Sequence, residues 1–123
     1  DPVADTWTPK ADMPTPRGAL ALTTVNGKIY AIGGQAQLLG PSLKTVEVYD
    51  PAKDLWTGDK DMLTARGSHS VSTVNGSIYA IGGWNPGAGT LATVEAYDPG
   101  FRPTSVNPAG KLPTMWGEVK VEK

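Results

Sequence analysis

The chain contains no cysteine and a single histidine, His69. Without cysteine there is no disulfide framework, no thiolate metal ligand, no cysteine nucleophile and no tyrosine–cysteine crosslinked cofactor. One imidazole is a poor basis for a zinc site, which typically takes three or four protein ligands. The flanking serines do not complete a nucleophile–base pair, because adjacent strand residues point to opposite faces of a sheet. We therefore expect no metal and no other cofactor.

The chain also lacks an excess of either charge. Lys and Arg number 11, Asp and Glu number 12, and no long run of one sign occurs. A nucleic-acid-binding surface is therefore not expected. The longest apolar stretches, such as Ile29–Ile32 and Ile78–Ile81, are far too short to span a bilayer. The sequence starts without Met or a charged-then-apolar leader, so it reads as an excised or mature piece; its compartment stays open, and export is compatible with it.

Helical periodicity is scarce, whereas glycine and proline are abundant. Fifteen glycines and eleven prolines among 123 residues separate short runs rich in Val, Ile, Thr, Tyr and Trp. Short strands bounded by such turn residues are typical of all-β domains. The length suits about one small domain. The sequence therefore predicts an all-β fold.

The chain repeats itself with an offset of 49 residues over most of its length. The segment Ile29–Gly34 recurs as Ile78–Gly83. Beyond each glycine pair the offset falls to 48, because residues 45–47 recur as residues 93–95. The residues after each glycine pair therefore form a loop that tolerates a change of length. Other recurring pairs are Trp7 with Trp56, Arg17 with Arg66, and Asn26-Gly27 with Asn75-Gly76.

One repeat reads as four short strands. Asn26-Gly27 supplies the two positive backbone φ angles that a type I′ hairpin requires. Gly33-Gly34 ends the strand that follows, and Asp50–Lys53 has the composition of a turn. The predicted strands of the first repeat are Ala19–Val25, Lys28–Ile32, Thr45–Tyr49 and Asp54–Gly58. Those of the second repeat are Ser68–Val74, Ser77–Ile81 and Thr93–Tyr97, and Asp5–Pro9 matches the fourth strand of the first repeat.

Several spaced residues give residues 1–99 a resemblance to kelch repeats. They are the Gly-Gly doublet, a tyrosine seven residues before a tryptophan (Tyr49 and Trp56), and the Met-x-Thr-x-Arg-Gly segment that precedes each repeat. One departure is Leu20, which stands where the second repeat has His69. The resemblance implies an all-β β-propeller of four-stranded blades, with two blades in this chain. The recurring residues expected to be structural are Trp7, Trp56, Gly33, Gly34, Gly82, Gly83, Tyr49 and Tyr97.

Two blades do not close a ring, because a propeller has about four to eight. The chain offers an unpartnered fourth strand (residues 5–9), a full blade (18–58) and three strands of a second blade (67–98). The missing strand should carry a tryptophan near Ser105, but the sequence has none there, and two prolines interrupt the segment. We expect the N-terminal strand of one copy to complete the last blade of another, head to tail. A six-bladed trimer is the favoured homo-oligomer; the alternative is that the chain is a C-terminal fragment of a longer kelch protein.

The tail, residues 100–123, has no match in the repeat. We expect it to be an extended arm that covers a sheet edge or packs Trp116 against the propeller. Two alternatives stay open, a recognition or sorting segment at the end of an exported protein and a disordered tail.

Antiparallel strand order places two sets of loops on one rim of the propeller. Residues 13–18 and 62–67 precede the first strand of each blade, and residues 35–44 and 84–92 follow the second. Loops held by a rigid scaffold commonly carry binding sites. The candidate ligand-binding residues on this loop face are Arg17, Arg66, His69, Gln35, Gln37, Trp84 and Asn85.

Both arginines recur in step with the repeat, so pairing with a backbone carbonyl or an acid is the structural alternative to anion binding. Trp84 does not recur, since Gln35 holds its place, and it is the better candidate for ligand contact. No catalytic set is evident. We therefore expect a non-enzymatic binding or scaffold module for protein ligands. The alternatives are a carbohydrate-binding or sugar-active propeller, with an acidic sugar held by the arginines and Trp84, and a purely structural assembly unit.

Overall fold

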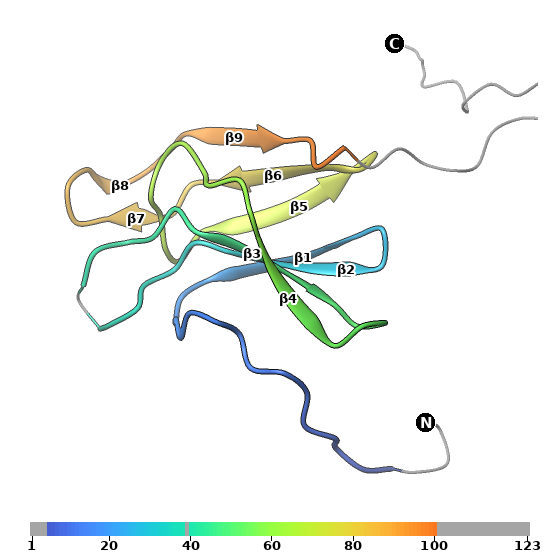
Figure 1. Ribbon diagram of the computed structural model, residues 1–123. Coiled ribbons are helices and arrows are strands. Elements are labelled where there is room, and N and C mark those ends of the chain that lie inside the picture. Colours follow the sequence, from blue (N-terminus) through green and yellow to red (C-terminus); the bar gives the residue numbers. More distant parts are fainter. Residues whose placement is uncertain (1–4, 39, 101–123) are drawn as a thin grey trace, which may run out of the picture.

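The structure, a computed structural model, describes residues 5–38 and 40–100 and consists there of two β-sheets side by side (Figure 1). The first sheet, blade one, has the antiparallel order β1-β2-β3-β4, and the second, blade two, has the order β5-β6-β9. A two-stranded sheet, β7-β8, lies in the connection between β6 and β9. No helix in this part of the chain is long and apolar enough to cross a membrane. The strands are β1 (Ala21–Val25), β2 (Lys28–Ile32), β3 (Val46–Asp50), β4 (Leu55–Asp59), β5 (Ser70–Val74), β6 (Ser77–Ile81), β7 (Trp84–Asn85), β8 (Gly89–Thr90) and β9 (Val94–Tyr97).

The hairpins between the first two strands of each blade have the expected backbone. Asn26 and Gly27 have φ angles of 53° and 74°, and Asn75 and Gly76 have 51° and 81°. Two consecutive positive φ angles match the twist of the flanking strands and keep them paired up to the turn. The pairing runs to Val25 opposite Lys28 in blade one.

The first strand of each blade begins two residues later than predicted. Ala19 and Ser68 both have a φ of 53°, which is the left-handed region and interrupts an extended strand. Each lies where the chain passes from the preceding connection into the blade, and the amide of Ser68 donates to the carbonyl of Ala19 at 2.8 Å. This bend brings the entries of the two blades into contact.

The fourth strand of blade one, β4, begins at Leu55 rather than at the predicted Asp54, which has a φ of 51°. The matching N-terminal segment, Asp5–Pro9, lies in no sheet of the described chain. Trp7 is 101% exposed, so the prediction that it packs as a structural residue is not met within one chain. The reason is that no strand in the described residues pairs with its segment. The tail that was predicted to be an extended arm lies, from residue 101 onward, outside the described residues.

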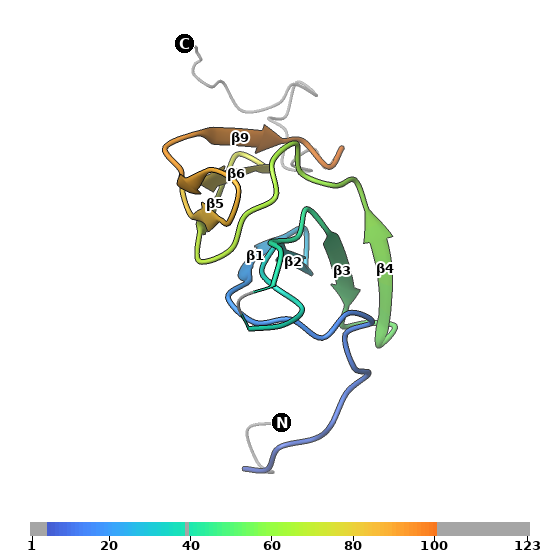
Figure 2. The same cartoon turned by 90° about the vertical axis from the view of Figure 1, so that its left-hand side faces the viewer.

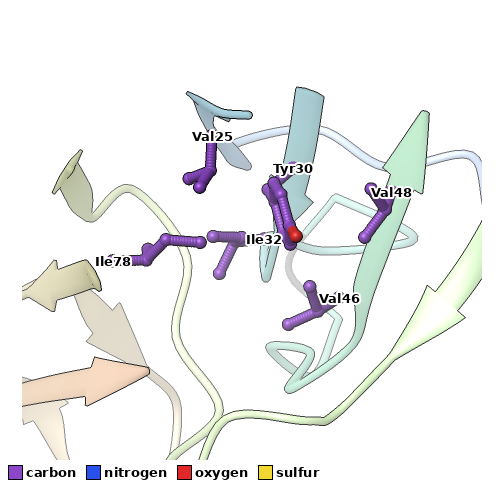
Figure 3. Packing of buried hydrophobic residues seen from close by; sticks show 6 residues of the cluster. All are labelled: Val25, Tyr30, Ile32, Val46, Val48 and Ile78. Carbon is purple, nitrogen blue, oxygen red and sulfur yellow. The ribbon is translucent and has the colours of Figure 1, made fainter. Parts of the chain in front are cut away.

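The hydrophobic core lies between the two blades. Tyr30 of β2 is opposite Val48 of β3, and both side chains lie on the face of blade one that turns toward blade two. Ile78, on β6, points from blade two toward Ile32 (Figure 3). The hydroxyl groups of Thr23 on β1 and Thr73 on β5 form a hydrogen bond of 2.6 Å, so the first strands of the two blades also contact each other. The six buried members of the cluster are Val25, Tyr30, Ile32, Val46, Val48 and Ile78.

The glycine pair at the end of β2 allows the blades to approach closely. Gly33 and Gly34 have φ angles of 68° and 95°. A Cβ atom on Gly33 would lie 2.5 Å from the carbonyl oxygen of Arg66 and 2.8 Å from Cε1 of His69. The amide of Gly34 donates to that same carbonyl of Arg66 at 2.9 Å. Only glycine supplies both this backbone and this clearance.

The two blades expose the same repeat positions very differently. The face of blade one that meets blade two is buried, whereas the corresponding face of blade two has no neighbour among the described residues (Figure 2). We call the exposed set the free face. The buried set is Val25 (3% exposed), Ile32 (3%) and Val46 (4%), and the free face is Val74 (55%), Ile81 (44%) and Val94 (57%).

Candidate functional site

The loop face forms as the strand order predicts. The connection before β1 bridges the connection after β2 through Gly18 and Gln35. In blade two, Gly67 and Trp84 exchange two backbone hydrogen bonds of 3.0 Å. Because each pair joins the two kinds of loop, these loops lie side by side and are anchored to the sheets.

Arg17 lies inside this layer and not on its surface. Its side chain is fully buried and donates to the carbonyl oxygens of Gly33 and Thr45 at 2.9 and 2.7 Å. Its second terminal nitrogen binds the carboxylate of Glu47 at 2.6 Å. The hydroxyl of Thr15 donates to the other oxygen of that carboxylate. The guanidinium therefore links the end of β2 to the start of β3.

Arg66 repeats this arrangement in blade two. Its fully buried guanidinium donates to the carbonyls of Gly82 and Thr93, and it binds the Glu95 carboxylate at 2.7 Å. The backbone amides of Leu63 and Thr64 donate to the same carboxylate at 2.6 and 2.9 Å. Burial opposes the ionisation of Glu95, but these donors outweigh it and hold its pKa below the usual value.

The arginines are therefore held in intramolecular pairs, and the candidate ligand role given to Arg17 and Arg66 does not fit their burial. An arginine whose carboxylate and carbonyl partners lie within the same chain has no free fork for an external anion. The structural alternative, pairing with carbonyls and an acid, describes what is present. The alternative prediction, an acidic sugar bound by the two arginines and Trp84, is therefore not supported at Arg17 and Arg66.

His69 is also buried, at the contact between the blades. It lies against Gly33 of blade one and Gly83 of its own blade. Neither ring nitrogen has a hydrogen-bond partner. Burial first, and then the charge of Arg66, lowers the pKa of His69 below its ordinary 6.5, while Glu95 acts in the opposite direction. His69 therefore behaves as a neutral packing group and not as a surface ligand contact.

The other candidates remain on or near the loop surface. Trp84 is 39% exposed and lies on the β7–β8 hairpin. The sequence predicted only a loop for this segment. Asn85 is partly committed, since its amide nitrogen donates to the Ala65 carbonyl and its oxygen accepts from the Ala88 amide. Gln35 donates to the Gly40 carbonyl at 3.1 Å. A depression of about 280 Å³ adjoins this loop in blade one; its lining residues are Gly18, Ala19, Gln35, Ala36, Gln37 and Leu38.

Within residues 5–38 and 40–100, no group of three or more His, Asp or Glu side chains is arranged to hold a metal ion. The structure therefore brings together a rigid loop face rather than a cluster of reactive groups. Its exposed aromatic feature is Trp84, placed next to the entry of blade two by the Gly67 bridge. Such a surface offers shape and apolar contact to a ligand.

Removing the Arg66 side chain is expected to destabilise the fold. Arg66→Ala leaves the mostly buried Glu95 carboxylate without its counter-ion, and breaking a buried pair in this way typically costs about 3–5 kcal/mol. Urea unfolding followed by circular dichroism measures the loss. Lys53→Ala, at an exposed turn position, is the matched control and should change the free energy of unfolding by less than about 0.5 kcal/mol. A similarly small loss for Arg66→Ala would contradict the structural role.

The buried neutral His69 is expected to make stability fall in mild acid. Its folded pKa lies below its unfolded value of 6.5, so the unfolded state binds the proton more tightly. The free energy of unfolding should therefore decrease as the pH falls through about 6.5 toward the folded pKa. His69→Leu, which copies Leu20 of the first repeat, should remove this decrease but keep the later loss, below about pH 4.5, that comes from Glu95. Equal pH slopes for the two proteins between about pH 7 and about pH 5 would show that His69 does not carry the effect.

Comparisons with known proteins agree with the repeat and the blade geometry. A search of curated proteins gave no match. Among solved structures 116 chains match, and one of them, described as "Structure of YjhT", is 26% identical with a TM-score of 0.58. That alignment covers 65% of this chain and 24% of the YjhT chain, so the chain spans about a quarter of its length. The Kelch motif matches residues 16–63 and again residues 65–102. With its two matches covering most of the sequence, the chain belongs to the family of kelch-repeat proteins.

Proposed function

We propose that this chain is a two-blade propeller unit that completes a ring with further copies of itself and binds a partner protein on its loop face. The observation that carries the first part is the free face. Three repeat positions that blade one buries against blade two are open to solvent in blade two. A side chain of this kind contributes about 1.5–3 kcal/mol when it is fully buried. An apolar face of this kind marks an interaction surface.

The back of blade one offers the complementary surface. In blade two this surface is formed by Val71 and Ile78, which pack against the core of blade one. The corresponding residues of blade one are Leu22, which is 59% exposed, and the partly buried Ile29. The free face of one copy can therefore dock on the back of blade one of another in the way that the two blades already dock within the chain. Such a contact is head to tail, so it either closes into a ring or continues as a filament, and we favour the ring.

The number of copies follows from two blades per chain. Propellers of about four to eight blades need two, three or four such chains, and we favour the six-bladed trimer. The competing occupant of the free face is a further blade of the same polypeptide. The chain's share of the YjhT chain, 24%, is compatible with that alternative. The two cases differ in the mass of the particle in solution.

Size-exclusion chromatography with light scattering tests the ring. The chain has a mass of 12.9 kDa, and the trimer predicts a single species of about three times that value. Val94→Asp places a charge on the free face and should shift the species to the monomer. Leu38→Asp is the control, because Leu38 is 90% exposed on the loop face and lies outside the docking surface. A wild-type protein that elutes as a monomer would mean that the missing blades come from elsewhere.

Partner binding on the loop face rests on Trp84. Its side chain is exposed, whereas both arginines of the same face are enclosed. The backbone bonds between Trp84 and Gly67 fix the hairpin, so the indole is presented at little cost in conformational entropy. Tryptophan in such a position is a frequent centre of binding energy in protein interfaces.

A photoreactive amino acid at residue 84 tests this surface. It should crosslink a partner protein that the same group at Lys53, in the exposed β3–β4 turn on the opposite rim, does not. With that partner purified, Trp84→Ala should weaken binding about tenfold or more, and Lys53→Ala should leave the affinity unchanged. A partner that binds both variants equally would remove the loop face from the proposal.

A further inference from the structure

Blade one shows what a finished outer edge looks like in this protein. Trp56 of β4 packs on Tyr49 of β3, with ring centroids 5.1 Å apart. Its indole N–H donates to the carbonyl of Ala11 at 2.9 Å. The Asp54 carboxylate accepts two hydrogen bonds, from the Tyr49 hydroxyl at 2.6 Å and from the Ala11 amide at 2.9 Å. Besides its backbone pairing with β3, the fourth strand is thus held by one tryptophan and one aspartate.

Blade two has the receiving half of this arrangement without the strand. By the repeat, Tyr97 of β9 corresponds to Tyr49, and Lys60 corresponds to Ala11. No strand of the described chain pairs with the outer edge of β9. An apolar cavity of about 180 Å³ lies between blade one and this part of blade two; its lining includes Ile32 and Val46 of blade one together with Lys60, Met62, Ala96 and Tyr97.

Asp59 stands in for the aspartate that the missing strand would bring. Both the hydroxyl of Tyr97 and the amide of Lys60 donate to Oδ1 of Asp59, each at 2.7 Å. These are the counterparts of the two donors that Asp54 receives in blade one. Burial, followed by the hydrogen bond to Asp59, raises the pKa of Tyr97 to about 12, so its hydroxyl keeps the proton that it donates.

A segment with the matching residues is free at the other end of the chain. The segment Asp5–Thr8 matches Asp54–Thr57 at the aspartate, the tryptophan and the last threonine. Asp5 already has a φ of 49°, close to the 51° of Asp54, and Trp7 is fully exposed. The segment leaves blade one on the side of the molecule opposite β9 (Figures 1 and 2). It therefore does not reach the edge of β9 in its own chain.

We propose that the cavity beside Tyr97 and the edge of β9 form a strand-capture site whose ligand is the segment Asp5–Pro9 of a second copy of this chain. The captured strand places Trp7 on the ring of Tyr97, with its indole N–H toward the Lys60 carbonyl. Its Asp5 carboxylate takes over the two donors that Asp59 holds, and Asp59 is released. This inference rests on the proposed ring and specifies how its joint is made and what competes with it.

The chain's own continuation is a poorer ligand for this site by sequence. Thr104 lies seven residues after Tyr97, where the tryptophan would stand, and Pro103 and Pro108 lack the amide protons that a paired strand donates. Burying an indole against an aromatic ring is among the largest apolar gains that one side chain offers. Trp7 therefore decides the choice of occupant in favour of the N-terminal segment.

Peptide binding to the intact chain tests the site directly. The receptor is the full chain with Trp7→Ala, which disables its own donor segment, and the probe is a fluorescent peptide of residues 1–13. Anisotropy should show saturable binding that the peptide with Trp7→Ala abolishes. The peptide with Asp5→Ala should bind this receptor within about twofold of the unaltered peptide, because the two donors then keep Asp59 as their acceptor.

A second receptor variant isolates the competition. Asp59→Ala in the receptor should tighten binding of the unaltered peptide about tenfold and should leave binding of the Asp5→Ala peptide unchanged. Asp12→Ala, at an exposed acidic position, is the matched control and should bind both peptides as the parent receptor does. Tyr97→Phe, added to Asp59→Ala, keeps the ring and removes the hydroxyl, so it should reduce the preference for the peptide that carries Asp5.

The outcomes separate strand capture from the ring. Equal binding of the unaltered and the Trp7→Ala peptides, or an assembled particle whose mass Trp7→Ala does not change, overturns strand capture. In the second case the ring itself stands. A chain that is monomeric but binds the peptide overturns the ring and supports the site. Binding that appears only after deletion of residues 101–123 would mean that the chain's own continuation occupies the edge, and this overturns the proposal for the intact protein.

Discussion

The packing of one blade's face on the back of the next is the contact on which this structure depends. Ile78 of blade two packs against Ile32 of blade one, and Gly33, which has no side chain, leaves room for the carbonyl of Arg66. Because the two blades are built from one repeat, each has a face and a back of the same kind. A stack of like units satisfies these surfaces inside and leaves one of each at its ends. The exposed valines of blade two follow from this arrangement and need no separate explanation.

Each buried arginine ties the connection that enters its blade to the sheet of that same blade. A guanidinium removed from water is tolerated when carbonyls and a carboxylate surround it, as they do for Arg66. The first repeat reaches the same result with different donors. Pro14 stands where Leu63 gives its amide to Glu95, and proline has no amide proton, so in blade one the hydroxyl of Thr15 serves Glu47. The interaction is therefore retained while its details change. Loops pinned at their base in this way can present Trp84 in one orientation.

The sequence predicted the elements that depend on local chemistry. The Asn-Gly hairpins and the glycine pairs were found because few residues adopt positive φ, and the blade followed from their spacing. The left-handed Ala19 was missed, since nothing in an alanine announces that conformation. The arginines were placed on the correct loops, but a repeating position does not tell a buried side chain from an exposed one. Trp7 was assigned to packing because it recurs in step with Trp56, and that inference fails within one chain because its segment lies in no sheet of the described residues.

The difference between the repeats at one position is explained by the unfinished blade. Lys10 in the first repeat corresponds to Asp59 in the second. In blade one the Tyr49 hydroxyl and the Ala11 amide already have Asp54, so the residue at position 10 does not need to accept a hydrogen bond. In blade two the same donors belong to Tyr97 and Lys60, and a lysine at position 59 would leave both without an acceptor, because an ammonium group only donates. A part-buried hydroxyl without a partner is costly, and Asp59 gives the Tyr97 hydroxyl an acceptor within the chain. The acid at position 59 therefore supplies, within a single chain, the acceptor that Asp54 supplies in blade one.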